Sequence, residues 1–367
     1  TNDRRQRQMC IRDSYIVTFK QWEEHNDSPN KIAFWFRSLI ELQKDLHKLN
    51  IPLCILKCDT YDDCPQKILK FTSANEINNL YFNIEYPVNE LKRDEQVQAV
   101  LEKMGTSCFS FHDQVIHVPG SLKTKAGTNF SVYSPFKRCW LAELDYALLE
   151  EHAIPTIKQP VSVNQQDEYD LHSYKQSNIN QDLWPVGEES IQKMIVNFLD
   201  RKGSDYKTDR NFPGLTATSM MSPYINSGVV SSKWCLNQAR ARNYDALDEG
   251  DKGLVHWISE ILWREFYRHI IYNFPRVSMG KAFQEHFEQV PWENNQDFIE
   301  AWKHGRTGIP IVDAGMRQMI ETGWMHNRLR MIVAMFLSKN LMVDWHIGEA
   351  FFMQHLIDGD IALSLIH

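Results

Sequence analysis

The chain has 367 residues, which is enough for two domains that each bury a hydrophobic core. Hydrophobic residues make up 43% and charged residues 24%, ordinary values for a globular protein. No run of about 18 apolar residues appears, so no transmembrane helix is expected, and the polar, basic start lacks the apolar stretch of a secretory signal. These features indicate a cytoplasmic protein.

The net charge of −7 argues at first against a nucleic-acid partner. Its distribution weakens that objection, because residues 201–344 carry 18 Lys and Arg against 16 Asp and Glu, a local balance of +2. The remainder carries 22 against 31. A surface that faces DNA is therefore expected only in the second half of the chain.

The cysteines and histidines predict no metal site. Cys54, Cys58 and Cys64 lie close in the sequence, but their spacing matches no zinc pattern, and reduced core and loop thiols are the simpler interpretation. None of the 14 histidines stands at a ligand spacing from a second ligand.

The two ends of the chain are expected to be non-native. Residues 9–14 can be encoded by a nucleotide sequence whose reverse complement, apart from two bases, can encode residues 363–367. Such a pair of ends is typical of translated adapter sequence. Residues 1–14 and 363–367 are therefore left out of the fold prediction, and the chain is interpreted as an internal fragment that is expected to be inactive on its own.

Residues 15–150 alternate between strand and helix patterns. Strands are predicted at residues 15–19, 51–57, 80–83 and 107–111, and helices at residues 28–49, 63–77 and 89–104. Ser28 and Pro29 suit an N-cap and a first helical position, and Gly105 suits a helix end. Strands separated by helices imply an α/β doubly wound domain with a parallel sheet. No glycine-rich dinucleotide or phosphate loop is present.

Residues 151–187 are polar and form a connector, after which only helical periodicity is found. Helices are predicted at residues 188–201, 222–242, 254–273, 311–322, 327–339 and 344–357. Residues 188–362 are therefore expected to form an all-α domain.

Four segments of the helical half could carry chemistry. Hydroxyls crowd before a predicted helix that has Ser222 as its N-cap and Pro223 as its first residue. This arrangement suits phosphate, although an ordinary capped helix is the simpler interpretation of the segment alone. Glu260, Trp263, Arg264 and Tyr267 recur at i, i+3, i+4 and i+7 and share one helix face. That stripe suits a cavity that stacks a base and pairs its edge, or a partly exposed helix surface.

The last two segments contain arginines and acids. Arg328 and Arg330 lie about 200° apart around one helix and must serve different partners, one of which could be a DNA phosphate and the other a buried acid. Asp358 and Asp360 offer two carboxylates, although such a sequence is usually only a turn.

Six motifs in order give a resemblance that no single one of them carries. They are KQWEEHNDSP (20–29), YSPFK (133–137), WREFYR (263–268), GIPIVDA (308–314), TGWMHNR (322–328) and LIDGDI (356–361). Residues 15–361 resemble the class I cyclobutane pyrimidine dimer photolyases of the photolyase/cryptochrome family. The resemblance implies light-driven repair of pyrimidine dimers in DNA by a monomeric enzyme, with an α/β antenna-binding domain and an all-α domain that binds FAD.

The resemblance also implies roles for individual residues. The pocket for the flipped dimer corresponds to Glu260, Trp263 and Met331, and Asn327 is expected to be a further catalytic residue. The DNA-backbone contacts correspond to Arg210, Arg264 and Arg328. FAD contacts correspond to Tyr206, Thr218, Ser219, Met220, Met221, Ser222, Trp257, Asn327, Arg330, Asp358 and Asp360, with Arg330 paired to Asp358. Trp292 and Trp345 correspond to the outer and middle members of a tryptophan chain that reduces the flavin.

The front domain resembles the part of the family that binds a methenyltetrahydrofolate antenna. His25, Asn89 and Glu90 correspond to its binding residues, but Met279 stands where a lysine is expected, with Lys281 nearby. Ser364 stands where the family has an asparagine beside the flavin, and the flavin-proximal tryptophan is missing, so the chain as given is expected to bind FAD weakly or not at all.

Three other functions remain open at this point. A cryptochrome would share the fold and the flavin but would have no need of a base-sized pocket. A (6-4) photolyase would be expected to show histidine near Met331, and a non-photochemical flavoprotein would be expected to have a phosphate loop in the front domain.

Overall fold

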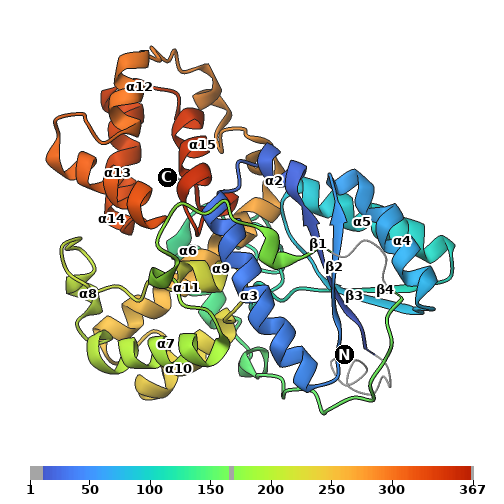
Figure 1. Ribbon diagram of the computed structural model, residues 1–367. Helices are drawn as coiled ribbons and strands as arrows, with labels where there is room; N and C mark the ends of the chain where they lie inside the picture. The colour runs from blue at the N-terminus through green and yellow to red at the C-terminus, as the bar shows by residue number, and fades with distance from the viewer. Residues whose placement is uncertain (1–10, 165–168, 365–367) are drawn as a thin grey trace. The chain divides into compact units, whose positions relative to one another are not determined.

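The computed structural model describes residues 11–164 and 169–364, so most of the two expected non-native ends lies outside the described residues (Figure 1). The chain divides into two compact units. The first comprises the chain up to His25, Trp35–Gln114 and Glu150–Lys175. The second comprises Asn26–Phe34, Val115–Leu149 and the chain from Gln176 on.

The first unit contains two small parallel sheets. β1 (Asp13–Thr18) pairs with β2 (Leu53–Cys58), and β3 (Asn79–Asn83) pairs with β4 (Ser107–Phe111). β2 is buried along almost its whole length, as expected for a parallel strand covered on both faces. The predicted parallel α/β arrangement is confirmed, with the described strands paired two by two.

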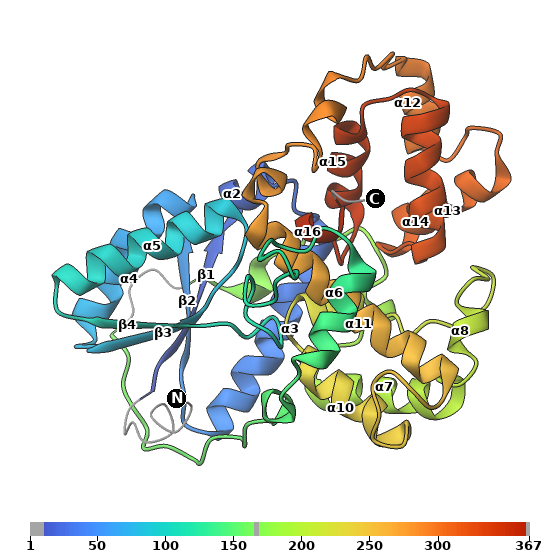
Figure 2. The ribbon, with the colours of Figure 1, turned by 180° about the vertical axis from the view of Figure 1, so that it is seen from behind.

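The helices of this part of the chain follow from local signals. They are α2 (Phe19–Glu24), α3 (Pro29–Lys48), α4 (Cys64–Ala74) and α5 (Val88–Lys103). The buried Ser28 accepts a hydrogen bond at Oγ from the Asn30 N–H, 3.2 Å away, as the predicted cap requires. Gly105 has a φ of +84° and follows α5. α4 and α5 lie side by side in both views (Figures 1 and 2).

The second unit is helical in its described part. Its helices are α6 (Tyr133–Ala142), α7 (Glu188–Lys202), α8 (Tyr206–Asp209), α9 (Ser222–Asn226), α10 (Ser232–Arg242), α11 (Lys252–Asn273), α12 (Gln296–Lys303), α13 (Pro310–Thr322), α14 (Asn327–Met335), α15 (Trp345–His355) and α16 (Ile361–Ser364). α11 carries the predicted stripe of functional residues and contacts α6, α8, α10 and α16.

A buried carboxylate ties residues 115–149 to α11. Glu265 is 2% exposed and accepts hydrogen bonds from the backbone N–H groups of Ile116 and His117, at 3.0 and 2.8 Å, and from Trp140 Nε1 at 2.7 Å. Burial raises the pKa of Glu265. These bonds explain why residues 115–149, which the sequence places in the front domain, belong to the second unit.

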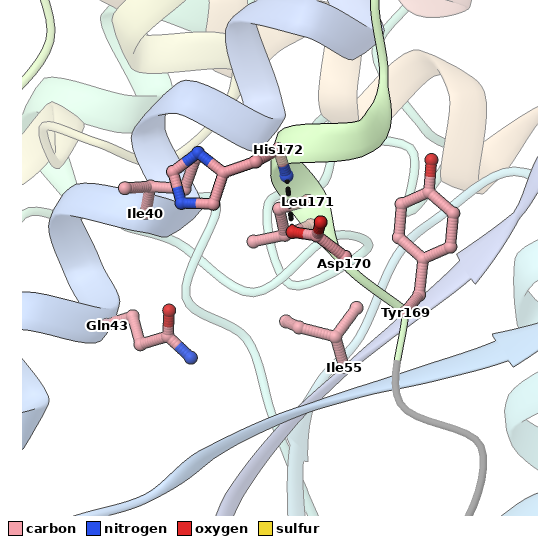
Figure 3. Close-up of a pocket in the computed structure, with 7 residues that line it drawn as sticks. All are labelled: Ile40, Gln43, Ile55, Tyr169, Asp170, Leu171 and His172. Atoms are coloured by element: carbon pink, nitrogen blue, oxygen red, sulfur yellow. Dashed lines mark hydrogen bonds between the residues drawn. The ribbon is translucent and has the colours of Figure 1, made fainter.

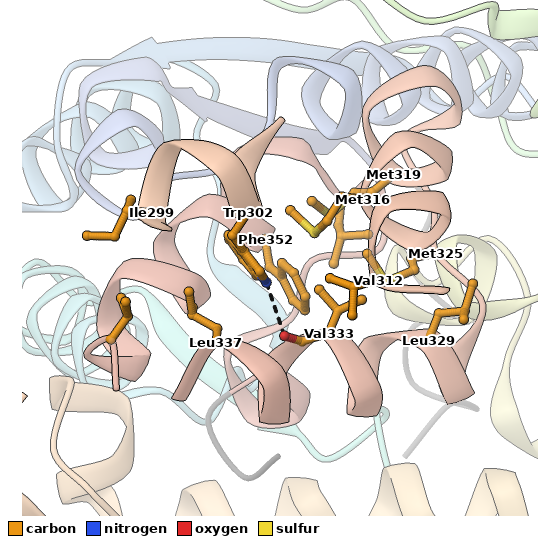
Figure 4. Close-up of a cluster of buried hydrophobic side chains, with 12 residues drawn as sticks. Ile299, Trp302, Val312, Met316, Met319, Met325, Leu329, Val333, Leu337 and Phe352 are labelled. Carbon is orange, nitrogen blue, oxygen red and sulfur yellow. Dashed lines mark hydrogen bonds between the residues drawn. The ribbon is translucent and has the colours of Figure 1, made fainter. Parts of the chain in front are cut away.

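A single apolar cluster fixes the orientation of α12 to α15 (Figure 4). Trp302 lies at its centre, stacked on Phe352 with ring centroids 5.8 Å apart, and its Nε1 donates to the Val333 carbonyl at 3.1 Å. Leu329 and Val333 bury one face of α14 in this cluster. The opposite face of α14 is therefore free to carry polar side chains.

Gly323 follows α13 and is hydrogen-bonded to the segment that precedes Asp358 and Asp360. It has a φ of +71°, and an added Cβ would lie 2.9 Å from Ile179 Cδ1, so glycine is required here. Its carbonyl accepts from the Ile357 N–H at 2.8 Å. This bond places Asp358 beside the start of α14.

Some helix predictions need correction. Residues 222–242 are not one helix but α9 and α10, because Gly228 takes a φ of +75° and Ser231 caps a new helix by accepting from the Trp234 N–H. Ser222 is the first residue of α9 rather than its N-cap. The predicted helix over residues 327–339 ends as α14 and continues as a π turn over Phe336–Asn340.

The packing at Gly253 gives a stability prediction. An added Cβ would lie 2.2 Å from the carbonyl oxygens of Gly203 and Ser204, so Gly253→Ala should lower the free energy of unfolding by about 3 kcal/mol despite the better helix propensity of alanine. Urea unfolding measures this. The control is Gly214→Ala, where an added Cβ meets nothing within 4 Å and little change is expected. Equal effects of the two variants would contradict the packing argument.

Candidate functional site

Glu260 and Trp263 lie one turn apart on α11, and neither side chain is sealed inside the protein. Glu260 forms an ion pair with Arg210 and remains 30% exposed. The Trp263 indole stacks on Tyr133, with ring centroids 3.6 Å apart and an angle of 11°, and lies 5.6 Å from the ring of Tyr267. The predicted stripe therefore presents an acid and an indole together, with one face of the indole covered by a tyrosine.

Tyr133 is a residue that the sequence did not single out for this site. Its hydroxyl donates to the Ser259 carbonyl at 3.0 Å, and Lys137 Nζ donates to the Ser259 hydroxyl at 2.7 Å. Burial raises the pKa of Tyr133, and the charge of Glu260 adds to the effect. Tyr133 begins the YSPFK motif, which was the available signal, but its contact with α11 lies more than a hundred residues away in the sequence.

Three arginines, one of them Arg210, the partner of Glu260, lie close to His326. Arg328 donates from Nε to Asn211 Oδ1 at 3.0 Å, and its Nη1 lies 3.5 Å from the sulfur of Met331. His326 caps α14 by accepting from the Arg328 N–H, and burial together with Arg328, Arg210 and Arg330 lowers its pKa. The cluster is consequently positive.

Asn327 and Arg264 are the remaining residues predicted to be catalytic and to contact the DNA backbone, respectively. Asn327 begins α14 and is exposed. Arg264 points towards α10, with its Nη1 3.2 Å from the Ser232 hydroxyl.

Arg330 and Asp358 form the predicted pair. Arg330 Nη2 lies 2.9 and 2.8 Å from the two carboxylate oxygens of Asp358, which is 4% exposed, and its Nε donates to the Met325 carbonyl at 2.8 Å. The expectation that Arg328 and Arg330 serve different partners, one of them a buried acid, is confirmed. The Ser222 hydroxyl also donates to Asp358, which is the role it takes in place of helix capping.

Asp360 is held by a second arginine that the sequence analysis did not assign. Arg268 pairs with Asp360 through two nitrogens and donates to Asn226 Oδ1 at 3.0 Å. Asn226 in turn donates to the Gly359 carbonyl at 3.3 Å, and Asp360 accepts from the Ala362 N–H at 2.9 Å. Arg268 closes the WREFYR motif, but the motif alone does not reveal its partner.

The segment between α8 and α9 lies against α11. Trp257, 2% exposed, donates from Nε1 to the Ser219 hydroxyl at 3.1 Å. Met220 takes a φ of +51°, Met221 is buried and Thr218 is partly buried. Tyr206 is buried in α8, with the Arg210 guanidinium 5.5 Å from its ring, and burial raises its pKa.

Trp292 and Trp345 lie in segments that hydrogen bonds join. The Glu293 N–H donates to the Met342 carbonyl at 2.8 Å, and the Asp344 N–H donates to Asn294 Oδ1 at 2.8 Å. The residues that follow Trp292 are thus fixed beside the residues that precede Trp345. Both indoles are partly exposed.

The three predicted antenna residues come together within the first unit. Asn89 Nδ2 and Gln21 Nε2 lie 3.0 and 3.1 Å from His25 Nε2, which therefore accepts, and His25 Nδ1 faces Glu90 Oε1 at 3.7 Å. The Tyr61 hydroxyl donates to Glu90 Oε1 at 3.2 Å. Burial raises the pKa of Glu90 to about 7. Its other oxygen, Oε2, is buried without a hydrogen-bond partner among the described residues.

Comparisons with known proteins agree with this arrangement. Residues 11–159 match the family described as DNA photolyase, and residues 257–367 match the FAD binding domain of DNA photolyase. A deoxyribodipyrimidine photo-lyase of Buchnera aphidicola is 37% identical over 95% of this chain and 72% of its own length, and that of Escherichia coli is 36% identical over 95% and 73%.

The chain belongs to the DNA photolyase family.

Other relatives show how much of a family member the chain spans. It is 36% identical over 95% of its length to the deoxyribodipyrimidine photo-lyase of Neurospora crassa, but covers only 60% of that protein. A class III photolyase of Agrobacterium tumefaciens superposes with a TM-score of 0.83 at 28% identity, over 97% of this chain and 72% of that one. A Synechocystis cryptochrome, at 22% identity and a TM-score of 0.84 over 97% and 75%, shares the fold.

The photolyase site fits FAD in its donor chemistry. Hydroxyls from Ser219 and Ser222, the Arg330 guanidinium and the Trp257 indole come from separate segments that are joined by hydrogen bonds. Two buried nitrogens of this region, Arg268 Nε and His326 Nε2, have no hydrogen-bond partner among the described residues. A polar ligand could satisfy such groups, whose burial without a partner is costly. α9 itself has only five residues, so no helix-dipole argument is attached to it.

Among the residues that the structure describes, no group of three or more His, Cys, Asp or Glu could hold a metal ion, and Cys54, Cys58 and Cys64 are buried free thiols. No helix within residues 11–164 or 169–364 is long and apolar enough to cross a membrane.

The Arg330–Asp358 pair gives a second stability prediction. Arg330→Met would leave a buried carboxylate without its cation and should cost about 3–5 kcal/mol of unfolding free energy in the flavin-free protein. The control is Arg242→Met, which breaks a pair with the half-exposed Asp200 and should cost less than about 1 kcal/mol. Similar losses in urea unfolding would show that the buried pair is not specially important.

The raised pKa of Glu90 gives a pH dependence. Between its ordinary value of 4.5 and about 7, the unfolded chain releases a proton that the folded chain retains, so the fold loses stability as pH rises through that window. Glu90→Gln should match the wild type near about pH 4 and exceed it by up to about 3 kcal/mol above about pH 7. Glu95→Gln, on the exposed side of the same helix, is the control. A pH-independent difference between Glu90→Gln and the wild type would contradict this.

Proposed function

We propose that the protein to which this chain belongs splits cyclobutane pyrimidine dimers in DNA, using light and reduced FAD. The observation that carries the proposal is the partly open pair of Glu260 and Trp263 on one face of α11, beside the positive cluster around Arg210 and Arg328. A flavin-based light sensor has no need for an acid and an indole presented together beside cations.

The arrangement suits a dimer that has left the DNA stack. Extruding a damaged base costs a few kcal/mol, least for a lesion that already distorts the duplex. Stacking on an indole returns about 1–3 kcal/mol per base. Because Tyr133 covers one face of Trp263, the dimer stacks on the other face.

The side chains around the indole then have separate roles. Glu260 accepts a hydrogen bond from the damaged base, and Met331 and Asn327 line the remaining side. Arg210, Arg264 and Arg328 contact the DNA backbone, whose negative charge can replace the carboxylate that Arg210 now pairs with.

The flavin would be held by the segments around Asp358. Arg330, Asp358, Asp360, Asn327 and Trp257 contact the isoalloxazine side, and Tyr206 and residues 218–222 contact the ribityl and phosphate parts. When bound, reduced FAD supplies the electron that opens the cyclobutane ring and takes it back afterwards. The protein holds dimer and flavin close to each other, and Trp292 and Trp345 relay electrons that return the flavin to its reduced state.

The first unit would bind methenyltetrahydrofolate as a light-harvesting antenna. The buried Oε2 of Glu90, which has no partner among the described residues, suits a ligand that brings an N–H donor. A photolyase of Sulfolobus tokodaii, 25% identical with a TM-score of 0.77, was crystallised with two FAD molecules, so the absorption spectrum of the released chromophore decides between folate and flavin. We further propose that the enzyme is a cytoplasmic monomer.

A repair assay tests the proposal. FAD-loaded protein is illuminated with dimer-containing DNA, and Glu260→Ala and Trp263→Ala are expected to lose repair while retaining flavin. Trp263→Ala should also weaken discrimination for damaged DNA by about 1–3 kcal/mol, roughly five- to 150-fold. Glu321→Ala, on the exposed side of α13, should repair normally.

Two outcomes would reject the proposal. Full repair by both pocket variants would place the lesion elsewhere. A flavin-loaded wild type that responds to light but repairs no DNA would favour the cryptochrome alternative.

A further inference from the structure

His346, the second residue of α15, lies flat on the indole of its neighbour Trp345. The ring centroids are 3.7 Å apart and the planes differ by 26°. Adjacent helical side chains do not normally face each other, so this contact requires an explanation outside the helix itself.

Two hydrogen bonds hold the imidazole in that position. Nδ1 lies 2.6 Å from Asp344 Oδ1, and Nε2 lies 3.0 Å from the Gly280 carbonyl oxygen. Both partners are acceptors, and a neutral imidazole has only one N–H to donate. Only the doubly protonated imidazolium satisfies both bonds at once.

The charges around His346 favour the same protonated form. Burial lowers the pKa of His346, but the bonds to Gly280 and Asp344 and the charges of Asp344 and Glu349 outweigh burial and raise it. Asp344 and Glu349 both flank α15 or lie within it, and the turn at Gly280 adds its carbonyl. Burial also raises the pKa of Glu349, which His346 opposes.

We infer that His346 is a positioning residue that controls how readily Trp345 gives up an electron. The inference rests on the proposed role of Trp345 in electron relay. When an electron leaves the indole towards the light-excited flavin, which is the oxidant, Trp345 becomes a radical cation, and an electron from Trp292 restores it. An imidazolium in face contact repels that positive charge, although it attracts the neutral ring. Loss of the His346 proton removes the repulsion and makes oxidation of Trp345 easier.

A fluorescence titration of the flavin-free chain tests the contact without any repair activity. An imidazolium stacked on an indole quenches its emission, because the excited ring passes an electron to the cation and takes it back without light. The emission of Trp345, taken as wild type minus Trp345→Phe, should rise by roughly twofold or more between about pH 5.5 and about pH 9.

Two variants complete the titration. In His346→Gln the Trp345 emission should be high and independent of pH, and in His304→Gln, which alters an exposed histidine on α12's C-terminal side, the titration should persist. A wild-type difference that does not change with pH, or one that survives in His346→Gln, overturns the inference.

Flavin photoreduction, measured in the FAD-loaded full-length protein to which this chain belongs, gives the functional readout. Its rate should increase with pH in the wild type, stay low in His346→Arg, which keeps a cation at every pH, and stay high in His346→Gln. If the DNA-repair assay fails while the fluorescence titration of Trp345 appears, the proposed function is wrong but the His346 contact stands. If photoreduction occurs with the same pH dependence in all three proteins, the inference fails whatever the repair assay shows.

Discussion

The buried pair of Arg330 and Asp358 is the interaction on which the candidate flavin site depends. Removing two charges from water is costly, and the cost is recovered only when the geometry is close to ideal and further bonds satisfy the carboxylate. Here the Ser222 hydroxyl supplies such a bond, and the Gly323 carbonyl fixes the chain one residue before the acid. Two carboxylates, Asp358 and Asp360, thereby join α9, α11 and α14, segments that are far apart in the sequence. These polar contacts hold α9, α11 and α14 together at the site, while the apolar cluster around Trp302 fixes α12 to α15 (Figure 4).

Local sequence patterns predicted most helices and strands, but not the positions at which a helix is interrupted. The strand over residues 107–111 and the helix beginning at Pro29 agree with β4 and α3. The break between α9 and α10 depends on a left-handed Gly228, which hydrophobic periodicity does not register. α6 and α12 were missed because each is short, and their apolar faces are defined by partners distant in the sequence. The cavity of about 320 Å³ lined by Tyr169 and Leu171 was also not predicted, because no sequence motif marks it (Figure 3).

The candidate site was also predicted only in part. Helical spacing put Glu260 with Trp263 and separated Arg328 from Arg330, because those relations are set within a single turn or two. The assignment of Asp358 to Arg330 and the grouping of His25, Asn89 and Glu90 came from resemblance, and the structure contains both contacts. Arg268, Asn226 and Tyr133 were not assigned, since their importance lies in long-range partners that one sequence does not display. The sequence therefore predicted the exposed reactive side chains of the site, but not the residues that hold them in position.

The way the chain is divided between its two units limits how this protein can be taken apart. Residues 115–149 follow the last strand of the α/β unit, yet they supply Tyr133 to the indole and the N–H donors to Glu265. Residues 150–175 then return to the first unit, while residues 26–34 belong to the second. Neither unit is a continuous stretch of the chain, so truncation at any one position does not give either unit complete. A unit built in this interleaved manner cannot be exchanged as a cassette, and changes in what it binds must come from substitutions made in place.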